Sequence, residues 1–229
     1  MKIFLIHGQN HKGSTYHIGR MLAEKLEGEI REFFLPKDFG EFCTGCTQCF
    51  MKEESRCPHY DRLLPITEVM DEADVLIFTS PVYVYHVTAP MKTFLDHYGY
   101  RWLVHRPEER MFKKQAVCIS TAAGAGMKSA NKDIADSLFY WGVPVIYKYG
   151  VAVRAVSYDR INDKRKAAID RKTTALARKI KARNGKVKPG LKTRGLFYIL
   201  RMAQKKGWNE ADSQYWRQKG WTEKKRPWK

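Results

Sequence analysis

Four cysteines fall within fifteen residues, in the spacing Cys43-x2-Cys46-x2-Cys49-x7-Cys57, and a proline follows the last of them. This spacing is typical of thiolates that ligate a cubane iron–sulfur cluster, because one loop must wrap around a compact core. The seven-residue gap is longer than the one in the ferredoxin run. A zinc site, a redox-active pair or plain reduced thiols would fit the same residues.

The fifth cysteine and the N-terminus bear on the cellular setting. Cys118 lies in an apolar run, 116–119, and is expected in the core. The apolar run at the N-terminus is too short for a signal peptide and is typical of a buried first strand. The sequence contains no run of eighteen apolar residues, so no transmembrane helix is predicted. Clustered cysteines without a secretion signal favour a reducing, cytoplasmic location.

A glycine-containing loop at residues 8–15 could bind a phosphate. It follows the apolar run 2–7 and precedes apolar positions at helical spacing, so it should join a strand to a helix. Ser14 or Thr15 is expected to cap that helix. Free backbone amides at a helix N-terminus favour a dianionic phosphate. Many strand–helix turns look like this, so the prediction depends on the neighbouring loops.

The rest of the pattern predicts how those loops are positioned. Strands are expected at 2–7, 30–35, 74–79, 116–121 and 143–149, and helices at 63–73, 91–98 and 134–141 fall between them. Such alternation predicts a doubly wound parallel α/β sheet. Ligands bind beyond the carboxyl ends of such strands, so loops 8–15, 80–88 and 121–126 should converge on one site. The cysteine loop, 36–58, follows the second strand.

The order of these motifs carries a family resemblance. After loop 8–15 and the cysteine run come Ser80-Pro81-Val82-Tyr83, Met91-Lys92-Thr93-Phe94-Leu95-Asp96 and Gly124-Ala125-Gly126. Over about residues 1–150 the chain resembles the NAD(P)H-dependent FMN reductases of the flavodoxin-like superfamily, and most closely the iron–sulfur flavoproteins. The resemblance implies a flavodoxin-like, five-stranded sheet, FMN as cofactor, NAD(P)H as substrate, and a homodimer or homotetramer with flavins near subunit interfaces.

There are departures from the family pattern. Gln9, Asn10 and His11 replace the usual Ser-Pro-Arg of the first loop, which removes a fixed cation near the phosphate. The acidic pair after the fourth cysteine is reduced to Asp61. The usual Asp-Arg after the Lys-x-Phe segment is Asp96-His97. Because the cation of the first loop is missing, flavin affinity is expected to be modest.

The resemblance assigns roles along the three loops. It implies flavin contacts from Gln9, His11, Gly13, Ser14, Thr15, Pro81, Val82, Tyr83, Val84, Tyr85, Thr121, Ala122, Ala123, Gly124 and Gly126. A [4Fe-4S] cluster would be held by Cys43, Cys46, Cys49 and Cys57. No catalytic side chain is expected, since the flavin carries the chemistry. Lys92 and Asp96, one helical turn apart, should form a structural ion pair or an interface contact. His7, His11, His86 and His97 show no ligand spacing, and of these only His11 is a predicted site residue.

The expected function is an FMN-dependent NAD(P)H oxidoreductase that passes electrons from a small-molecule donor to an acceptor. That acceptor would be a quinone, a flavin, a nitro compound or an iron–sulfur centre. The alternative is an iron–sulfur flavoprotein that serves as an electron carrier or redox sensor without strong NAD(P)H turnover.

The basic charge belongs to the C-terminal region. Residues 161–229 hold 22 basic and 5 acidic residues, a net charge of +17, whereas residues 1–160 are nearly neutral. We expect a flavodoxin-like domain at 1–183 and a basic, aromatic arm at 184–229. Aromatics interleaved with cations can contact nucleic acid, and residues 191–206 could lie on a membrane surface. Regularly spaced aromatics more often mean burial on the protein's own core or on a second subunit, and that interpretation is favoured.

Overall fold

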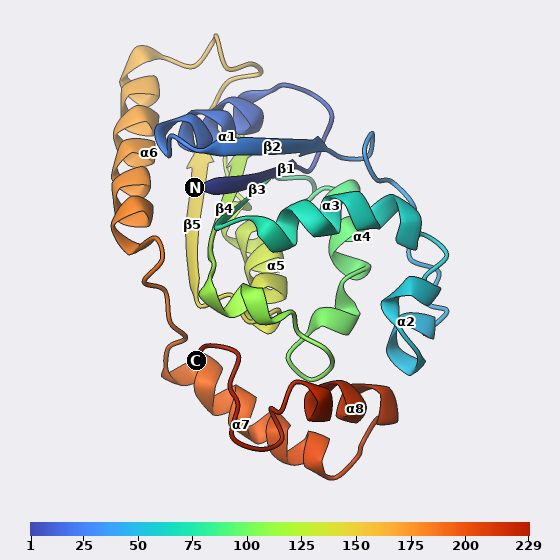
Figure 1. Ribbon diagram of the computed structural model, residues 1–229. Helices are drawn as coiled ribbons and strands as arrows, with labels where there is room; N and C mark the ends of the chain where they lie inside the picture. The colour runs from blue at the N-terminus through green and yellow to red at the C-terminus, as the bar shows by residue number, and fades with distance from the viewer.

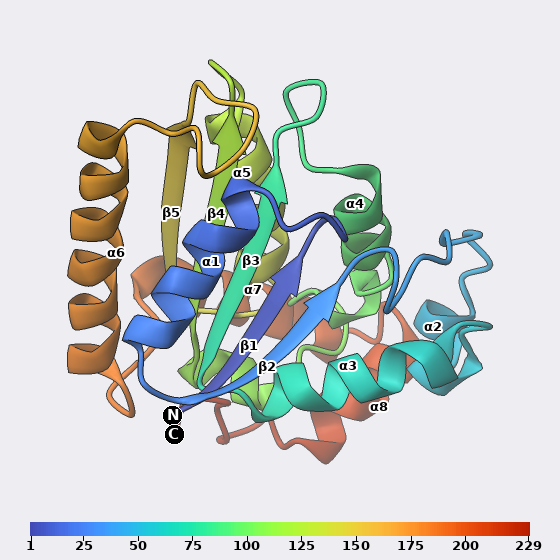
Figure 2. The ribbon, with the colours of Figure 1, turned by 90° about the horizontal axis from the view of Figure 1, so that it is seen from above.

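A computed structural model describes residues 1–229, and its centre is one parallel sheet of five strands. The strands are β1 (Lys2–His7), β2 (Glu29–Phe34), β3 (Val75–Pro81), β4 (Gln115–Ala122) and β5 (Val145–Ala152). They lie in the order β2-β1-β3-β4-β5, and every pair is parallel (Figure 2). The predicted flavodoxin-like sheet is confirmed, and its strand order reverses between β1 and β3.

Helices cover both faces of the sheet. On one face lie α1 (Ser14–Lys25) and α6 (Asp163–Arg183), and on the other lie α3 (Tyr60–Glu72), α4 (Ala89–Asp96) and α5 (Met127–Tyr140), as Figure 1 shows. Successive side chains of a strand point to opposite faces. Phe4 therefore packs in the core beneath α3, α4 and α5, whereas Leu5 packs in the core beneath α1 and α6. Central strand β3 is buried on both faces, which explains its continuous apolar run.

Some predicted boundaries and caps were wrong. Helix α4 begins at Ala89, two residues before the predicted start, because the Thr88 side chain caps it by accepting a hydrogen bond from the Met91 amide. Neither Ser14 nor Thr15 caps α1. The cap residue is Gly13, which has no side chain to accept a hydrogen bond, and Ser14 is already helical.

The C-terminal arm folds as two helices, α7 (Leu191–Lys205) and α8 (Glu210–Gln218). Phe197, Trp216 and Trp221 are fully buried and form a third, small core with Leu103 and Phe112. Those two residues belong to the segment 99–113, which also holds two 3-10 turns, Gly99–Arg101 and Glu109–Lys113. Most of the arm's aromatics thus pack on the same chain, although Trp208 remains 75% exposed. No helix is both long and apolar enough to cross a bilayer.

The arm also contacts the cysteine loop, which carries the short helix α2 (Gln48–Met51) and a 3-10 turn at Glu54–Arg56. Buried Arg106 forms an ion pair with buried Asp212 of α8 and donates to the backbone carbonyls of Cys49 and Phe50. Asn209 also donates to the Phe50 carbonyl, at 3.4 Å. The position of the cysteine loop therefore depends on residues more than 150 positions later in the chain.

Candidate functional site

The N-terminus of α1 is open at the carboxyl end of β1. Its cap, Gly13, offers no side-chain acceptor, and its first turn contains no acidic residue. The first amides of a helix have no intrahelical partner, so Ser14, Thr15 and Tyr16 present unpaired donors here. This is the arrangement that binds a phosphate dianion. Lys12 lies exposed on the preceding loop, beside His11, and adds a positive charge close to the helix end.

Hydrogen bonds tie this loop to its two neighbours. The Thr88 hydroxyl donates to the Gly8 carbonyl, and the Thr88 amide donates to the Ser80 hydroxyl at 3.0 Å. The buried hydroxyls of Thr15 and Thr121 are hydrogen-bonded to each other. Buried, paired polar groups of this kind fix a loop strongly, because breaking them leaves unsatisfied donors. The predicted loops 8–15, 80–88 and 121–126 therefore lie together at one edge of the sheet.

The second loop is a tight hairpin whose tip is exposed. Tyr83 and His86 exchange both backbone hydrogen bonds, each at 3.0 Å, and Val84 and Tyr85 between them have φ values of 47° and 67°. A two-residue turn with both φ values positive normally uses Asn or Gly. A β-branched residue such as Val84 costs of order 1–3 kcal/mol there. The hairpin is nevertheless anchored, because Asp133 accepts from the Val87 amide and is hydrogen-bonded to His86.

This hairpin presents an apolar, aromatic surface toward solvent. Tyr83, Val84 and Tyr85 are 54%, 93% and 64% exposed. The Tyr83 hydroxyl donates to the Gln9 side chain at 2.8 Å, which links the hairpin to the first loop. Exposed apolar groups held in a strained conformation indicate a binding surface rather than a packing element.

The third loop runs beside the hairpin. Gly126 has φ of 94°, and a Cβ atom there would lie 2.6 Å from the Val82 side chain, so only glycine fits. At Gly124 a Cβ atom would meet nothing within 4 Å, so open space adjoins that backbone. We call the open region that these three loops border the cradle. A cavity of about 620 Å³ is lined by other residues, among them Met127, Lys148 and Gly150.

The structure brings the predicted flavin contacts to this cradle or its margin. They are Gln9, His11, Gly13, Ser14, Thr15, Pro81, Val82, Tyr83, Val84, Tyr85, Thr121, Ala122, Ala123, Gly124 and Gly126. Their roles toward a flavin stay predictions. Lys92 and Asp96 form an ion pair on the exposed face of α4.

The four clustered cysteines are free thiols. Cys43 and Cys46 are exposed, and Cys49 and Cys57 are half-buried. Burial, together with the neighbouring thiols, raises the pKa of Cys49 to about 11. No three of the four have sulfur atoms within 4.8 Å of one another, as the ligands of a single tetrahedral ion would.

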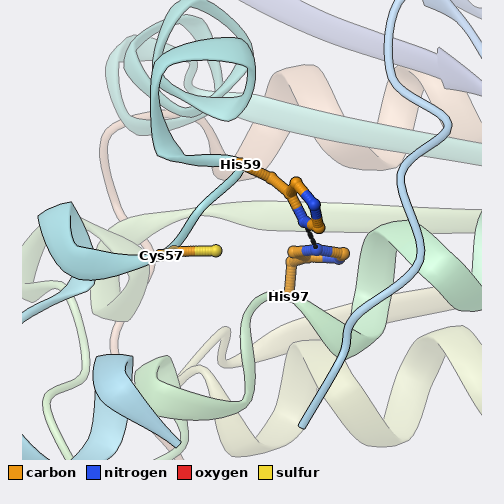
Figure 3. A group of neighbouring side chains, drawn as sticks. All are labelled: Cys57, His59 and His97. Atoms are coloured by element: carbon orange, nitrogen blue, oxygen red, sulfur yellow. Dashed lines mark hydrogen bonds between the residues drawn. The ribbon is translucent and has the colours of Figure 1, made fainter. Parts of the chain in front are cut away.

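One of the four lies in a different group of ligands. Cys57, His59 and His97 each offer a ligand atom, and these atoms all lie within 4.8 Å of one another (Figure 3). The His59 Nδ1 and His97 Nε2 atoms are 3.0 Å apart. Burial lowers the pKa of His97, so this imidazole is neutral near pH 7. Sequence spacing missed both histidines, since only the Cys57-x-His59 pair is local and His97 comes from another helix.

Thiol reactivity should follow this burial. With Ellman's reagent at pH 8, Cys43 and Cys46 are expected to react first, because they are exposed, and Cys49 more slowly. Complete burial raises the pKa of Cys118 to about 12, so this thiol should react only after unfolding. Stopped-flow titration with and without denaturant checks the order. A native protein in which all five thiols react in one fast phase would contradict it.

Comparison with known proteins agrees with the geometry. The family model described as NADPH-dependent FMN reductase matches residues 1–157. The chain belongs to this family. The match covers the sheet through β5 and all three loops of the cradle, and it ends before α6 and the basic arm.

Curated relatives of this family member include iron-sulfur flavoproteins of two archaeal species. An iron-sulfur flavoprotein of Archaeoglobus fulgidus is 33% identical over 130 residues, which is 55% of each chain. An iron-sulfur flavoprotein of Methanocaldococcus jannaschii is 31% identical over 99 residues, or 42% of this chain and 50% of that protein. The chain spans about half the length of the curated relatives it matches.

Solved structures share the fold at low sequence identity. An azoreductase from Bacillus anthracis superposes with a TM-score of 0.61 at 11% identity, covering 78% of this chain and 99% of that one. An NAD(P)H:quinone oxidoreductase from Methanothermobacter marburgensis gives a TM-score of 0.56 at 16% identity, over 76% and 94%. These likenesses establish the flavodoxin-like fold of the FMN reductase family member.

Proposed function

We propose that this chain is an FMN-dependent oxidoreductase that takes a hydride from NAD(P)H and passes electrons to a small-molecule acceptor. The observation that carries the proposal is the convergence of three loops around the uncapped N-terminus of α1, at the point where the strand order reverses. Membership of the NADPH-dependent FMN reductase family supports it. The acceptor is a quinone, a free flavin, a nitro compound or an iron–sulfur centre.

The residues of the cradle fit an FMN. The amides of Ser14 and Thr15 would bind the phosphate, and the open space beside Gly124 with the exposed hairpin 83–86 would receive the flat ring. Bound FMN supplies hydride acceptance and one- or two-electron transfer. The chain's own residues would orient the flavin and shield it from water. Tyr83 and Tyr85 provide an apolar wall, and the hydrogen bonds of Thr88 and Thr15 hold the loops in place.

Cofactor content and turnover test this proposal. Heat treatment of the purified chain should release FMN, identified by chromatography. The FMN-loaded protein should oxidise NADPH or NADH in the presence of a soluble quinone, at least about tenfold faster than the same concentration of free FMN. Release of FAD alone, or an apoprotein that does not bind FMN, would refute the proposal.

A second candidate is an iron–sulfur flavoprotein acting as an electron carrier or redox sensor. The four free thiols favour it, as does the name of the archaeal relatives. In that case Cys43, Cys46, Cys49 and Cys57 would hold a [4Fe-4S] cluster that exchanges single electrons with the flavin. Thr88, at the start of α4, joins the loops of the cradle, and Cys57 lies beside His97 at the end of the helix. A cluster and a flavin would therefore lie at opposite ends of α4.

Serine substitutions distinguish a cluster from a zinc site, a redox-active pair or plain reduced thiols. If all four thiols hold iron, each of Cys43→Ser, Cys46→Ser, Cys49→Ser and Cys57→Ser should remove most iron and sulfide while FMN stays bound. Iron, sulfide and zinc analysis of anaerobically purified protein gives the result. Cys118→Ser is the matched control, because Cys118 is buried in β4 and outside the loop. Flavin-loaded protein without iron or sulfide would remove this candidate.

We also propose that the protein is a homo-oligomer in which a second subunit covers the hairpin 83–86. Its own chain leaves Tyr83, Val84 and Tyr85 exposed next to the cradle, and contiguous apolar groups of this kind are typical of interfaces. Light scattering of the wild type and of Val84→Asp would test the assignment. A monomeric wild-type protein would contradict it.

A further inference from the structure

We propose that Cys57, His59 and His97 form a binding site for a single divalent metal ion of the zinc type. The site is distinct from the set of four cysteines except for Cys57, and it does not depend on the proposed flavin chemistry. The three side chains lie around the start of α3 and the end of α4 and point toward one another (Figure 3). Thiolate and imidazole are the ligands that zinc prefers, and three protein ligands leave a fourth position for water or another donor.

The spacing of the ligand atoms is close to what an ion requires. Bonds of about 2.0–2.1 Å to nitrogen and 2.3 Å to sulfur at a tetrahedral angle place two nitrogens about 3.3 Å apart, and nitrogen and sulfur about 3.6 Å apart. The two histidine nitrogens are 3.0 Å apart, and every ligand pair lies within 4.8 Å. Small side-chain rotations therefore suffice to close the three ligands around one ion.

The hydrogen bonds of His97 orient it as a ligand. Its Nδ1 atom lies 2.8 Å from the Thr93 backbone carbonyl, which only accepts, so Nδ1 carries the proton. The unprotonated Nε2 then faces His59. Histidines that bind zinc usually donate their other ring nitrogen to a carbonyl or carboxylate in this way. The ring is also held by Phe39, which packs edge-on at 4.8 Å between ring centroids.

Binding of the ion requires one proton to move between ring nitrogens and one thiol proton to leave. Without metal, His59 Nδ1 donates to His97 Nε2, so this N–H···N bond occupies the place of the ion. On binding, His59 moves its proton from Nδ1 to Nε2, and Cys57 releases its thiol proton to solvent. One sulfur–metal and two nitrogen–metal bonds form, and no oxidant or reductant is needed.

The scaffold around the site is rigid. His59 is the residue before α3, His97 is the residue after α4, and the two segments are joined by a hydrogen bond of 2.6 Å between the hydroxyls of Thr67 and Tyr98. Backbone bonds of 3.0 Å from the Cys57 amide to Glu54 and from the Tyr60 amide to Cys57 fix the thiol's turn. Ligands held at the ends of two joined helices bind metal with less ordering cost than ligands on a free loop.

The shared cysteine has a consequence for the cysteine loop. A thiolate bound to the ion with His59 and His97 is unavailable as the fourth ligand of an iron–sulfur cluster. Zinc at this site and a four-cysteine cluster therefore exclude each other, and the histidine variants separate the two.

Cobalt(II) titration tests the site, because tetrahedral cobalt reports thiolate ligation in its visible and near-ultraviolet bands. Metal-free, full-length protein is titrated anaerobically with Co²⁺, and then with Zn²⁺ against a chromophoric chelator. We expect one equivalent of Co²⁺ with a sulfur-to-cobalt charge-transfer band, displaced by Zn²⁺. Cys57→Ser should lose the band. His59→Gln and His97→Gln each remove a direct ligand and should weaken binding by more than about 100-fold, beyond the 10- to 100-fold that loss of an outer-shell partner costs.

Matched variants keep the test decisive. Cys43→Ser and Cys46→Ser change exposed thiols of the same loop, and His17→Asn changes a histidine on α1, across the sheet. All three should bind Co²⁺ as the wild type does. Because His97 is buried, circular dichroism checks that its variant folds, and the half-buried His59 gives an independent result if it does not. Binding that survives both histidine substitutions but is lost in Cys43→Ser would overturn the proposal and assign the metal to the cysteines alone.

Discussion

Ser14→Glu should weaken FMN binding about a thousandfold while leaving the protein folded. Ser14 is the first residue of α1, at the uncapped helix end where the phosphate is expected. Two like charges about 4 Å apart interact by about 4 kcal/mol at an effective dielectric constant of 20. That energy corresponds to roughly a thousandfold weaker binding. The same carboxylate should stabilise the apoprotein slightly, by about 0.3–1 kcal/mol, because it complements the helix dipole.

Riboflavin provides the internal control, because it has the same ring and no phosphate. Fluorescence titration of apoprotein with both flavins should show that Ser14→Glu weakens FMN strongly and riboflavin hardly at all. Ser14→Ala, which removes only the hydroxyl, should cost FMN about tenfold at most. Unchanged FMN affinity, or an equal loss for both flavins, would show that the phosphate does not bind at α1.

Asp212→Ala should produce the largest loss of stability, about 3–5 kcal/mol. Asp212 is 1% exposed and pairs with Arg106, itself buried, and with His105 at 2.7 Å. Removing the carboxylate leaves the guanidinium buried without its counterion. For a chain of this size the loss corresponds to roughly a 10 °C fall in melting temperature. Thermal and urea denaturation followed by circular dichroism measure both quantities.

The same helix supplies the control. Glu210 pairs with Arg217 at 2.6 Å, but its side chain is 77% exposed, so Glu210→Ala should change stability by less than about 1 kcal/mol. Arg106→Ala combined with Asp212→Ala should cost less than the sum of the two single changes, because they share one interaction. Equal, small effects of Asp212→Ala and Glu210→Ala would mean that the arm does not depend on the buried pair.

Arg106 also makes the cysteine loop sensitive to the arm. It donates to the carbonyls of Cys49 and Phe50, so loss of its partner should loosen the loop as well as the small core of Phe197, Trp216 and Trp221. The arm therefore has a structural role within its own chain, in addition to any role between subunits.

Local sequence pattern was enough to predict the sheet and the general location of the cradle. The apolar run of β3 is buried on both faces, and alternation of strands with helices forces parallel pairing, so both features follow from residues close together in the chain. Parallel strands place their carboxyl ends together. Residues such as Ser14, Tyr83 and Gly126 were therefore assigned to one edge without knowledge of any contact. The prediction that Ser14 or Thr15 caps α1 was wrong, because both are already helical and the Thr15 hydroxyl bonds Thr121, a partner distant in the sequence.

Side chains that meet across long sequence separations could be found only from the packed fold. His97 joins Cys57 and His59 because α4 ends beside the start of α3, and nothing in the spacing of 38 residues between the two histidines encodes that approach. Arg106 finds Asp212 because the arm folds back onto the segment 99–113, which brings residues 106 positions apart into contact. Sequence periodicity and turn preferences reflect interactions within a few residues. Ligand sets and buried ion pairs depend instead on how the helices and strands pack against one another.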